Sequence, residues 1–153
     1  MNIFAHYMNT MNKKKNVAAV VGMAVALRKN CAELRKNKEH ILQLENTLLS
    51  DLRANGVLFH RNGKGERVPG NMSISFSGFE GEMILHRLDL MGIQVSTGSA
   101  CDSVNTKISH VLKAIKTDEK SAIGTIRISL GKENTVEEVH SIVKAIGQIL
   151  KND

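Results

Sequence analysis

Apolar residues spaced three and four positions apart predict helix in the first third of the chain. One such run covers residues 17–27, and a second, with charged residues between its apolar positions, covers residues 34–52. The Asn55-Gly56 pair that follows is typical of a helix end. The pattern leaves open whether the two runs are separate helices or one helix bent near residues 29–30.

The period of the apolar residues changes to two after residue 56, which predicts short strands. The candidate strands are residues 57–60, 71–76, 93–95 and 124–131. The last of them alternates most clearly. One face carries Ile126, Ile128 and Leu130, and the other carries Thr125, Arg127 and Ser129.

Helical spacing returns between these strands and after the last of them. A helix through residues 83–91 is expected to follow a capping box of Ser77 and Glu80 and to end at Gly92. Another helix is expected over residues 108–115. Thr135 and Glu138 have capping-box spacing, and the helix after them carries an apolar stripe of Val136, Val139, Ile142, Val143, Ile146 and Leu150.

Together these elements predict an α/β fold, specifically an α+β two-layer sandwich. We expect a short, mostly antiparallel sheet with helices packed on one face. The apolar face of strand 124–131 should be buried against the stripe of the last helix. Residues 1–15 show no clear period and are expected to be a poorly specified lead-in, with residues 16–153 forming one domain.

The composition narrows the class of protein. A chain of 153 residues with 42% hydrophobic residues is expected to fold as one domain with a modest core. No apolar run approaches the roughly 20 residues of a membrane helix, and the N-terminus lacks the pattern of a signal peptide. Two cysteines make no disulfide framework, so we expect a cytoplasmic protein with reduced thiols.

The formal net charge of +6 is unevenly distributed. Residues 1–70 hold 12 basic and 5 acidic residues, and residues 71–153 hold 9 and 10. A basic region can bind nucleic acid, but only 3% of the residues are aromatic and no nucleic-acid motif is present. We therefore expect solvated basic helix faces rather than a nucleic-acid interface.

Cys101 is the first candidate for chemistry. It lies in "VSTGSACDS", a stretch of small and polar residues that offers a thiol no bulky apolar neighbours. A thiolate on such a loop is accessible as a nucleophile. The adjacent Asp102 disfavours the thiolate, however, and residue types alone leave open an inert exposed thiol.

The remaining candidates are weaker. Arg127 is fixed on the polar face of a strand, which suits bidentate binding of a carboxylate, but its spacing alone favours an ordinary surface arginine. Cys31 has helical spacing with apolar neighbours and is expected to pack. His60 and His110 lie near elements that flank the cysteine loop. No metal site is expected, since the cysteines lack the close ligand pairs of zinc sites.

Longer stretches resemble a known family. "VPGNMSISFSGFEGEMILHRLDLMGIQVSTGSACDS", "SHVLKAI" and "GTIRISLGKENTVEEV" are similar to the C-terminal small domain of cysteine desulfurases, class V aminotransferases of fold type I that use pyridoxal phosphate. The Ser-Thr-Gly-Ser-Ala-Cys loop is that of the type serving nitrogen fixation and iron–sulfur cluster assembly. The resemblance runs in unbroken order over about residues 16–151.

The resemblance implies roles for two residues. Cys101 matches the nucleophile that takes sulfur from L-cysteine as a persulfide, leaving alanine, and passes it to a sulfur acceptor or iron–sulfur scaffold protein. Arg127 matches the arginine that holds the substrate carboxylate. In the family, the cysteine loop moves between the cofactor and the sulfur acceptor. Small polar residues would allow this movement, which accounts for the surroundings of Cys101.

The resemblance also implies that the large cofactor-binding domain is absent. The family's Schiff-base lysine follows a histidine, and no His-Lys pair occurs in this sequence. Lys14-Lys15 replaces the family's Gly-Thr before "NVA", and Asp102 replaces the usual Thr or Ser. We therefore expect no bound pyridoxal phosphate and no activity from this chain alone.

Two interpretations follow. The chain is predicted to be a truncated cysteine desulfurase, a transferase fragment that carries the persulfide-forming cysteine. The alternative is a non-enzymatic sulfur-carrier or partner-binding module. In either case the sheet face carrying Arg127, which the large domain would cover, is expected to be exposed or to mediate self-association.

Overall fold

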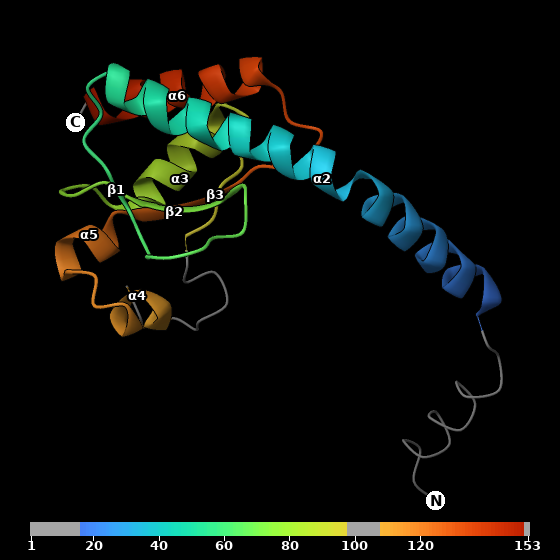
Figure 1. Cartoon of the computed structure of the whole chain (residues 1–153). Coiled ribbons are helices and arrows are strands. Elements are labelled where there is room, and N and C mark those ends of the chain that lie inside the picture. The colour runs from blue at the N-terminus through green and yellow to red at the C-terminus, as the bar shows by residue number, and fades with distance from the viewer. Residues whose placement is uncertain (1–15, 98–107, 152–153) are drawn as a thin grey trace, which may run out of the picture. The chain divides into compact units, whose positions relative to one another are not determined.

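The computed structural model describes residues 16–97 and 108–151. Their elements, in chain order (Figure 1), are α2 (Val17–Ala54), β1 (His60–Arg61), β2 (Asn71–Ser75), α3 (Gly81–Leu90), α4 (His110–Ala114), α5 (Glu119–Ile123), β3 (Thr125–Ser129) and α6 (Val136–Lys151). The chain divides into two compact units, residues 1–37 and 38–153, which are described separately.

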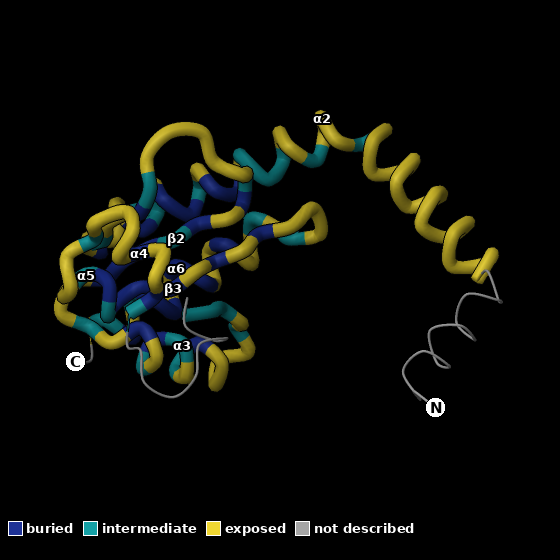
Figure 2. The backbone as a smooth tube through the Cα atoms, turned by 90° about the horizontal axis from the view of Figure 1, so that it is seen from below, coloured by how far each residue is buried: buried dark blue, intermediate teal, exposed yellow. Residues whose placement is uncertain are grey.

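The first unit contributes the N-terminal part of α2. This part is exposed along almost its whole length, as Figure 2 shows. The packing expected for Cys31 is wrong: its side chain is exposed. Leu27 and Leu34, its neighbours at helical spacing, are themselves 63% and 66% exposed, so this face provides no apolar surroundings for the thiol.

Helix α2 settles the alternative that the pattern left open. Residues 17–54 form one helix, and it continues through residues 29–30. It ends where Asn55-Gly56 predicts. Gly56 adopts a positive φ of 72°, and the N–H of Val57 donates to the carbonyl of Leu52 at 3.0 Å.

The second unit is built on a three-stranded antiparallel sheet in the order β1-β2-β3. In the register of β2 and β3, Ser73 lies opposite Arg127 and Ile74 lies opposite Ile126. All four expected strands are shorter than predicted, and two of them lose most of their length. Only His60 of residues 57–60 is in a strand, and the segment after 93–95 contributes a single bridge, Ser96 to Arg127.

One face of the sheet forms the core, as the alternation predicted. Figure 1 shows α3, α6 and the part of α2 that belongs to this unit on that side of the sheet. The core joins the strand residues to the stripe of α6, and its members include Met72, Ile74, Ile126, Ile128, Leu130, Val139, Ile142, Val143 and Ile146. Ile128 is only 2% exposed. The expected α/β fold with a short antiparallel sheet is confirmed.

The other face of the sheet is polar, and only part of it is open. Arg127 and Ser129 are exposed, as expected. Ser75 and Thr125 are buried, and the hydroxyl of Thr125 donates to the carbonyl of Ser121 in α5. Figure 1 shows α4 and α5 on this side of the sheet. The short helices therefore close one end of the face that the sequence suggested was free.

Local capping explains where α6 begins. The N–H of Glu138 donates to Thr135 Oγ1 at 3.2 Å, and the N–H of Thr135 donates to Glu138 Oε2 at 3.0 Å. This reciprocal pair is the predicted capping box. The side-chain amide of Asn134 and the backbone N–H of Thr135 donate hydrogen bonds that lower the pKa of Glu138.

The capping box expected at Ser77 is wrong. The N-cap of α3 is Glu80, and no side chain caps it. Gly78 has a φ of 90°, and the N–H of Phe79 donates to the carbonyl of Phe76, so residues 76–79 form a turn before the helix. The helix starts at Gly81, where a side chain would not fit, because an added Cβ would lie 2.6 Å from the carbonyl oxygen of Thr125.

Candidate functional site

The candidate site lies on the open part of the polar sheet face, around Arg127. Strand alternation places this side chain opposite the core, since Ile126 and Ile128 on either side of it are buried. Its backbone is held from both sides. It pairs with Ser73 of β2, and it bridges Ser96, with the Arg127 N–H donating to the Ser96 carbonyl at 2.6 Å.

The guanidinium of Arg127 is exposed. Within residues 16–97 and 108–151 it makes no hydrogen bond or ion pair. An arginine whose backbone is fixed on two sides and whose head group is unpaired can accept an anionic ligand in bidentate geometry. The sequence predicted this residue, and the structure gives it a defined position.

Cys101 lies outside the described residues, and so does nearly all of the surrounding loop, roughly residues 97–106, which we expect from the sequence to be mobile. The structure does describe the chain on either side. Ser96 precedes the segment and is held by two backbone hydrogen bonds to Arg127. Ser109 follows it, is buried, and accepts the N–H of Val111 at the start of α4. Both attachment points of the cysteine segment thus belong to ordered elements.

The two histidines singled out from sequence do not approach the guanidinium through any described contact. His60 lies on β1, opposite Ser75, and is exposed. The hydrogen bond from the backbone N–H of Ser121 is the main cause of a lowered pKa of Asp118, to which His60 makes the smallest contribution. His110 opens α4 and is also exposed. In the described part of the chain, no three His, Cys, Asp or Glu side chains gather as metal ligands would.

Sequence reasoning missed a buried polar network beside Arg127. The side-chain amide of Asn62 donates to Ser75 Oγ at 2.7 Å and to Ser73 Oγ at 3.1 Å. Ser75 Oγ in turn lies 2.7 Å from Thr125 Oγ1. Asn62 is only 6% exposed although it follows the strand in a glycine-containing turn. The one available signal was the polar half of the alternation in "NMSIS".

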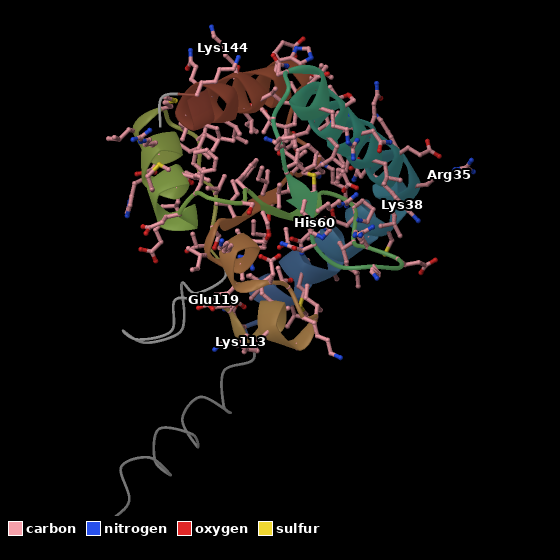
Figure 3. The ribbon with its side chains drawn as sticks, turned by 90° about the vertical axis from the view of Figure 1, so that its left-hand side faces the viewer. Arg35, Lys38, His60, Lys113, Glu119 and Lys144 are labelled. Carbon is pink, nitrogen blue, oxygen red and sulfur yellow. The ribbon has the colours of Figure 1, made fainter. Side chains whose placement is uncertain are left out.

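The described residues do not fit pyridoxal phosphate. The cofactor needs a lysine for a Schiff base and an acidic partner for its ring nitrogen. Every lysine in the described part of the chain is exposed. Two of them, Lys113 and Lys144, lie at opposite ends of the view in Figure 3 and therefore do not share a site.

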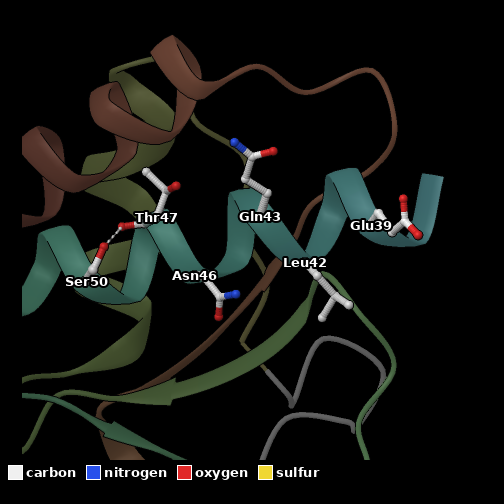
Figure 4. A pocket seen from close by; sticks show the side chains of 6 residues that line it. All are labelled: Glu39, Leu42, Gln43, Asn46, Thr47 and Ser50. Carbon is white, nitrogen blue, oxygen red and sulfur yellow. Dashed lines mark hydrogen bonds between the residues drawn. The ribbon is translucent and has the colours of Figure 1, made fainter. Parts of the chain in front are cut away.

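A surface depression on α2 does not suggest a catalytic site either. One depression of ≈ 560 Å³ runs along the outer side of α2 (Figure 4), lined by Glu39, Leu42, Gln43, Asn46, Thr47 and Ser50. The hydroxyl of Ser50 donates to the carbonyl of Thr47, an ordinary contact within a helix. We assign no chemistry to this depression.

No helix in the described residues has the length and apolar content needed to cross a membrane.

Comparison with known proteins gives a consistent result. The family model for class-V aminotransferases matches residues 9–142. The chain is 36% identical over 138 residues to the cysteine desulfurase IscS of Dictyoglomus turgidum and 34% identical over 140 residues to that of Clostridium botulinum. Each match covers 90% of this chain and 35% of the relative, so the chain spans about a third of these relatives' length.

Solved structures agree with the sequence matches. A NifS-like protein superposes with a TM-score of 0.77 at 34% identity, over 92% of this chain and 35% of that chain. The X-ray structure of a NifS-like protein from Rickettsia africae gives a TM-score of 0.76 at 26% identity, over 90% of this chain and 36% of that chain. From its sequence and its fold, this chain belongs to the class-V aminotransferase family, in which it resembles part of a cysteine desulfurase.

Proposed function

We propose that this chain is the part of a cysteine desulfurase that carries the persulfide-forming cysteine, Cys101, together with the arginine that binds the substrate carboxylate, Arg127. One observation carries the proposal: Ser96 bridges Arg127 through two backbone hydrogen bonds. The chain that leads to Cys101 therefore starts beside the guanidinium. Five residues span at most about 18 Å, which keeps the thiol within reach of a ligand held there.

The two residues have complementary tasks. The guanidinium holds the carboxylate of an amino acid at a fixed distance from the sheet. The thiolate of Cys101 attacks sulfur, and the small polar residues around it in the sequence leave the thiol accessible. The product is a persulfide on Cys101, which a thiol of a sulfur acceptor or iron–sulfur scaffold protein then takes over.

Cleavage of the C–S bond of cysteine needs an electron sink, which pyridoxal phosphate supplies in this family. Since the described residues do not fit that cofactor, we assign this chain alone no cleavage step. The step that its own residues support is sulfur exchange. The Cys101 thiolate attacks the outer sulfur of a donor persulfide, R–S–SH. A new S–S bond forms, the old one breaks, and R–S⁻ leaves, so no oxidant or reductant is needed.

The test compares two single-cysteine variants. The chain is treated with a small-molecule persulfide, and the peptides are analysed by mass spectrometry after alkylation. We expect added sulfur on Cys101, retained in Cys31→Ser and lost from that peptide in Cys101→Ser. Because Cys31 is exposed, it is the competing acceptor, and the peptide-level readout separates the two. Faster sulfur uptake by Cys31 than by Cys101 would contradict the proposal.

A second assay tests the assignment of cleavage to the whole enzyme. The chain is incubated with L-cysteine and pyridoxal phosphate, and alanine and sulfide are measured. We expect background rates. Turnover that disappears in Cys101→Ser would show that the chain assembles a complete cofactor site, against the proposal.

A further inference from the structure

Hydroxyl groups of Ser73, Ser75 and Thr125 on the polar sheet face are connected, through the Asn62 amide, by a chain of hydrogen bonds whose donors can be assigned. Thr125 Oγ1 lies 2.8 Å from the carbonyl oxygen of Ser121, which can only accept. The Thr125 proton is therefore used there. Ser75 must then donate its own proton to Thr125 Oγ1, 2.7 Å away.

This direction fixes the orientation of the Asn62 amide. Ser75 Oγ already donates its proton to Thr125, so it must accept a hydrogen bond from the amide nitrogen, 2.7 Å away. The second hydrogen of the same nitrogen is directed to Ser73 Oγ at 3.1 Å. A flipped amide would place an oxygen against an oxygen that has no proton left to give.

Ser73 is left with a proton that no described residue accepts. Its oxygen receives the Asn62 hydrogen bond, so its O–H is free to donate outward. Ser73 is half-buried and lies directly opposite Arg127 in the sheet register. Side chains of directly opposed residues share a face, with Cβ atoms about 5 Å apart. The oriented hydroxyl and the unpaired guanidinium are thus neighbouring donors on the open part of the face.

Three other hydroxyls close to Arg127 cannot play the same part. Ser75 and Thr125 are buried and their protons are used. Ser96, on the far side of Arg127, donates its hydroxyl to the carbonyl of Thr97 at 3.0 Å.

We propose that Ser73 is the second donor to the carboxylate that Arg127 binds, and that Asn62 is the residue that positions the Ser73 hydroxyl. This inference rests on the proposed function, since it takes the carboxylate site at Arg127 as given. The second donor would make the site specific for carboxylates. A planar anion with two acceptor oxygens can take a hydrogen bond from each donor, whereas a ligand without a carboxylate meets two unsatisfied donors.

The experiment titrates the ¹⁵N-labelled chain with L-alanine, which has the carboxylate of an amino acid but no reactive sulfur, and follows the Arg127 side-chain signal by NMR. We expect binding of L-alanine and none of alaninamide. Ser73→Ala should weaken binding about tenfold, the loss of one hydrogen bond to a charged group. Ser73→Thr keeps a hydroxyl and should restore most of the affinity.

Matched variants separate the possible failures. Ser129→Ala removes an exposed serine from the same face of the same strand as Arg127, and it should leave the affinity unchanged. If Arg127→Gln abolishes binding while Ser73→Ala binds like the unaltered chain, the role of Arg127 stands and that of Ser73 is overturned. If the unaltered chain binds no L-alanine, this inference falls, while the persulfide assay still decides the role of Cys101.

The positioning role of Asn62 has its own readout. Asn62→Ala should weaken L-alanine binding in the unaltered chain and have no further effect when Ser73 is already alanine. A merely structural role would weaken binding equally in both backgrounds, and that outcome would overturn the assignment.

Discussion

Replacing Glu45 by alanine should remove a large part of the stability of the unit formed by residues 38–153. Glu45 is only 5% exposed, and both of its carboxylate oxygens are used. Oε1 accepts from Arg61 Nη2 at 2.7 Å, and Oε2 accepts from the N–H of Gly70 at 2.9 Å. The carboxylate thus ties α2 to β1 and to the residue before β2.

The expected magnitude follows from what the substitution leaves behind. Arg61 would keep a guanidinium with a side-chain exposure of 19% and no counter-charge, and its Nε is already buried without a partner. The N–H of Gly70 would lose its acceptor. Breaking one side of such a pair costs about 3–5 kcal/mol, against a total of about 5–15 kcal/mol for a domain.

Urea unfolding followed by circular dichroism gives the free energy of unfolding by linear extrapolation. The matched control is Glu133→Ala. This carboxylate is 3.8 Å from Lys132 with a side-chain exposure of 90%, and its loss should change the free energy by less than about 1 kcal/mol. The double variant Glu45→Leu/Arg61→Leu should be more stable than Glu45→Leu alone, because no unpaired charge remains. A cost for Glu45→Ala as small as that of the control would refute the reasoning.

Three further predictions test other parts of the structure. Gly147→Ala should raise the free energy of unfolding by about 0.5–1 kcal/mol, since the added Cβ in α6 meets no atom within 4 Å; Gly124→Ala should lower the melting temperature, because its Cβ would fall 2.0 Å from the carbonyl oxygen of Phe76. The capping hydrogen bonds that lower the pKa of Glu138 contribute to stability above its ordinary pKa, and this contribution is lost as the pH falls through the lowered value. In Glu138→Gln, the melting temperature should therefore depend less on pH over this acidic range. A pH profile unchanged from that of the unaltered chain would contradict the assignment. Cys31 should react with a thiol reagent in the native chain at the rate of a free thiol, and protection until unfolding would show that the exposure is wrong.

Much of the local structure was determined by the sequence alone. The end of α2 follows from Asn55-Gly56, because glycine adopts the positive φ of the turn at little cost. The start of α6 follows from Thr135 and Glu138, whose side chains and backbone satisfy each other within one turn. The core face of β3 follows from alternation. In each case residues a few positions apart decide the outcome.

The candidate residues were predicted unequally. Arg127 was found from its position on a polar strand face and from the family resemblance, and Cys101 from its loop motif, whose role stays a prediction. Asn62 was missed. Its neighbours in sequence are a glycine turn and a two-residue strand, and nothing local marks an asparagine there as buried.

The tertiary structure decided what depends on which surfaces meet. Cys31 has the spacing of a packed residue, yet it is exposed, because periodicity shows that a face is apolar and not that another element covers it. Ser75 and Thr125 alternate like solvent-facing residues, yet they are buried where their hydroxyls bond within the network that leads to Ser121 in α5. Glu45 looks like a helix-surface charge, yet Arg61 and Gly70, distant in sequence, satisfy it inside the fold. A polar group is stable inside the fold only when it has hydrogen-bond partners there. For Glu45 and Ser75 these partners lie 13 or more residues away in the sequence, where no local pattern indicates them.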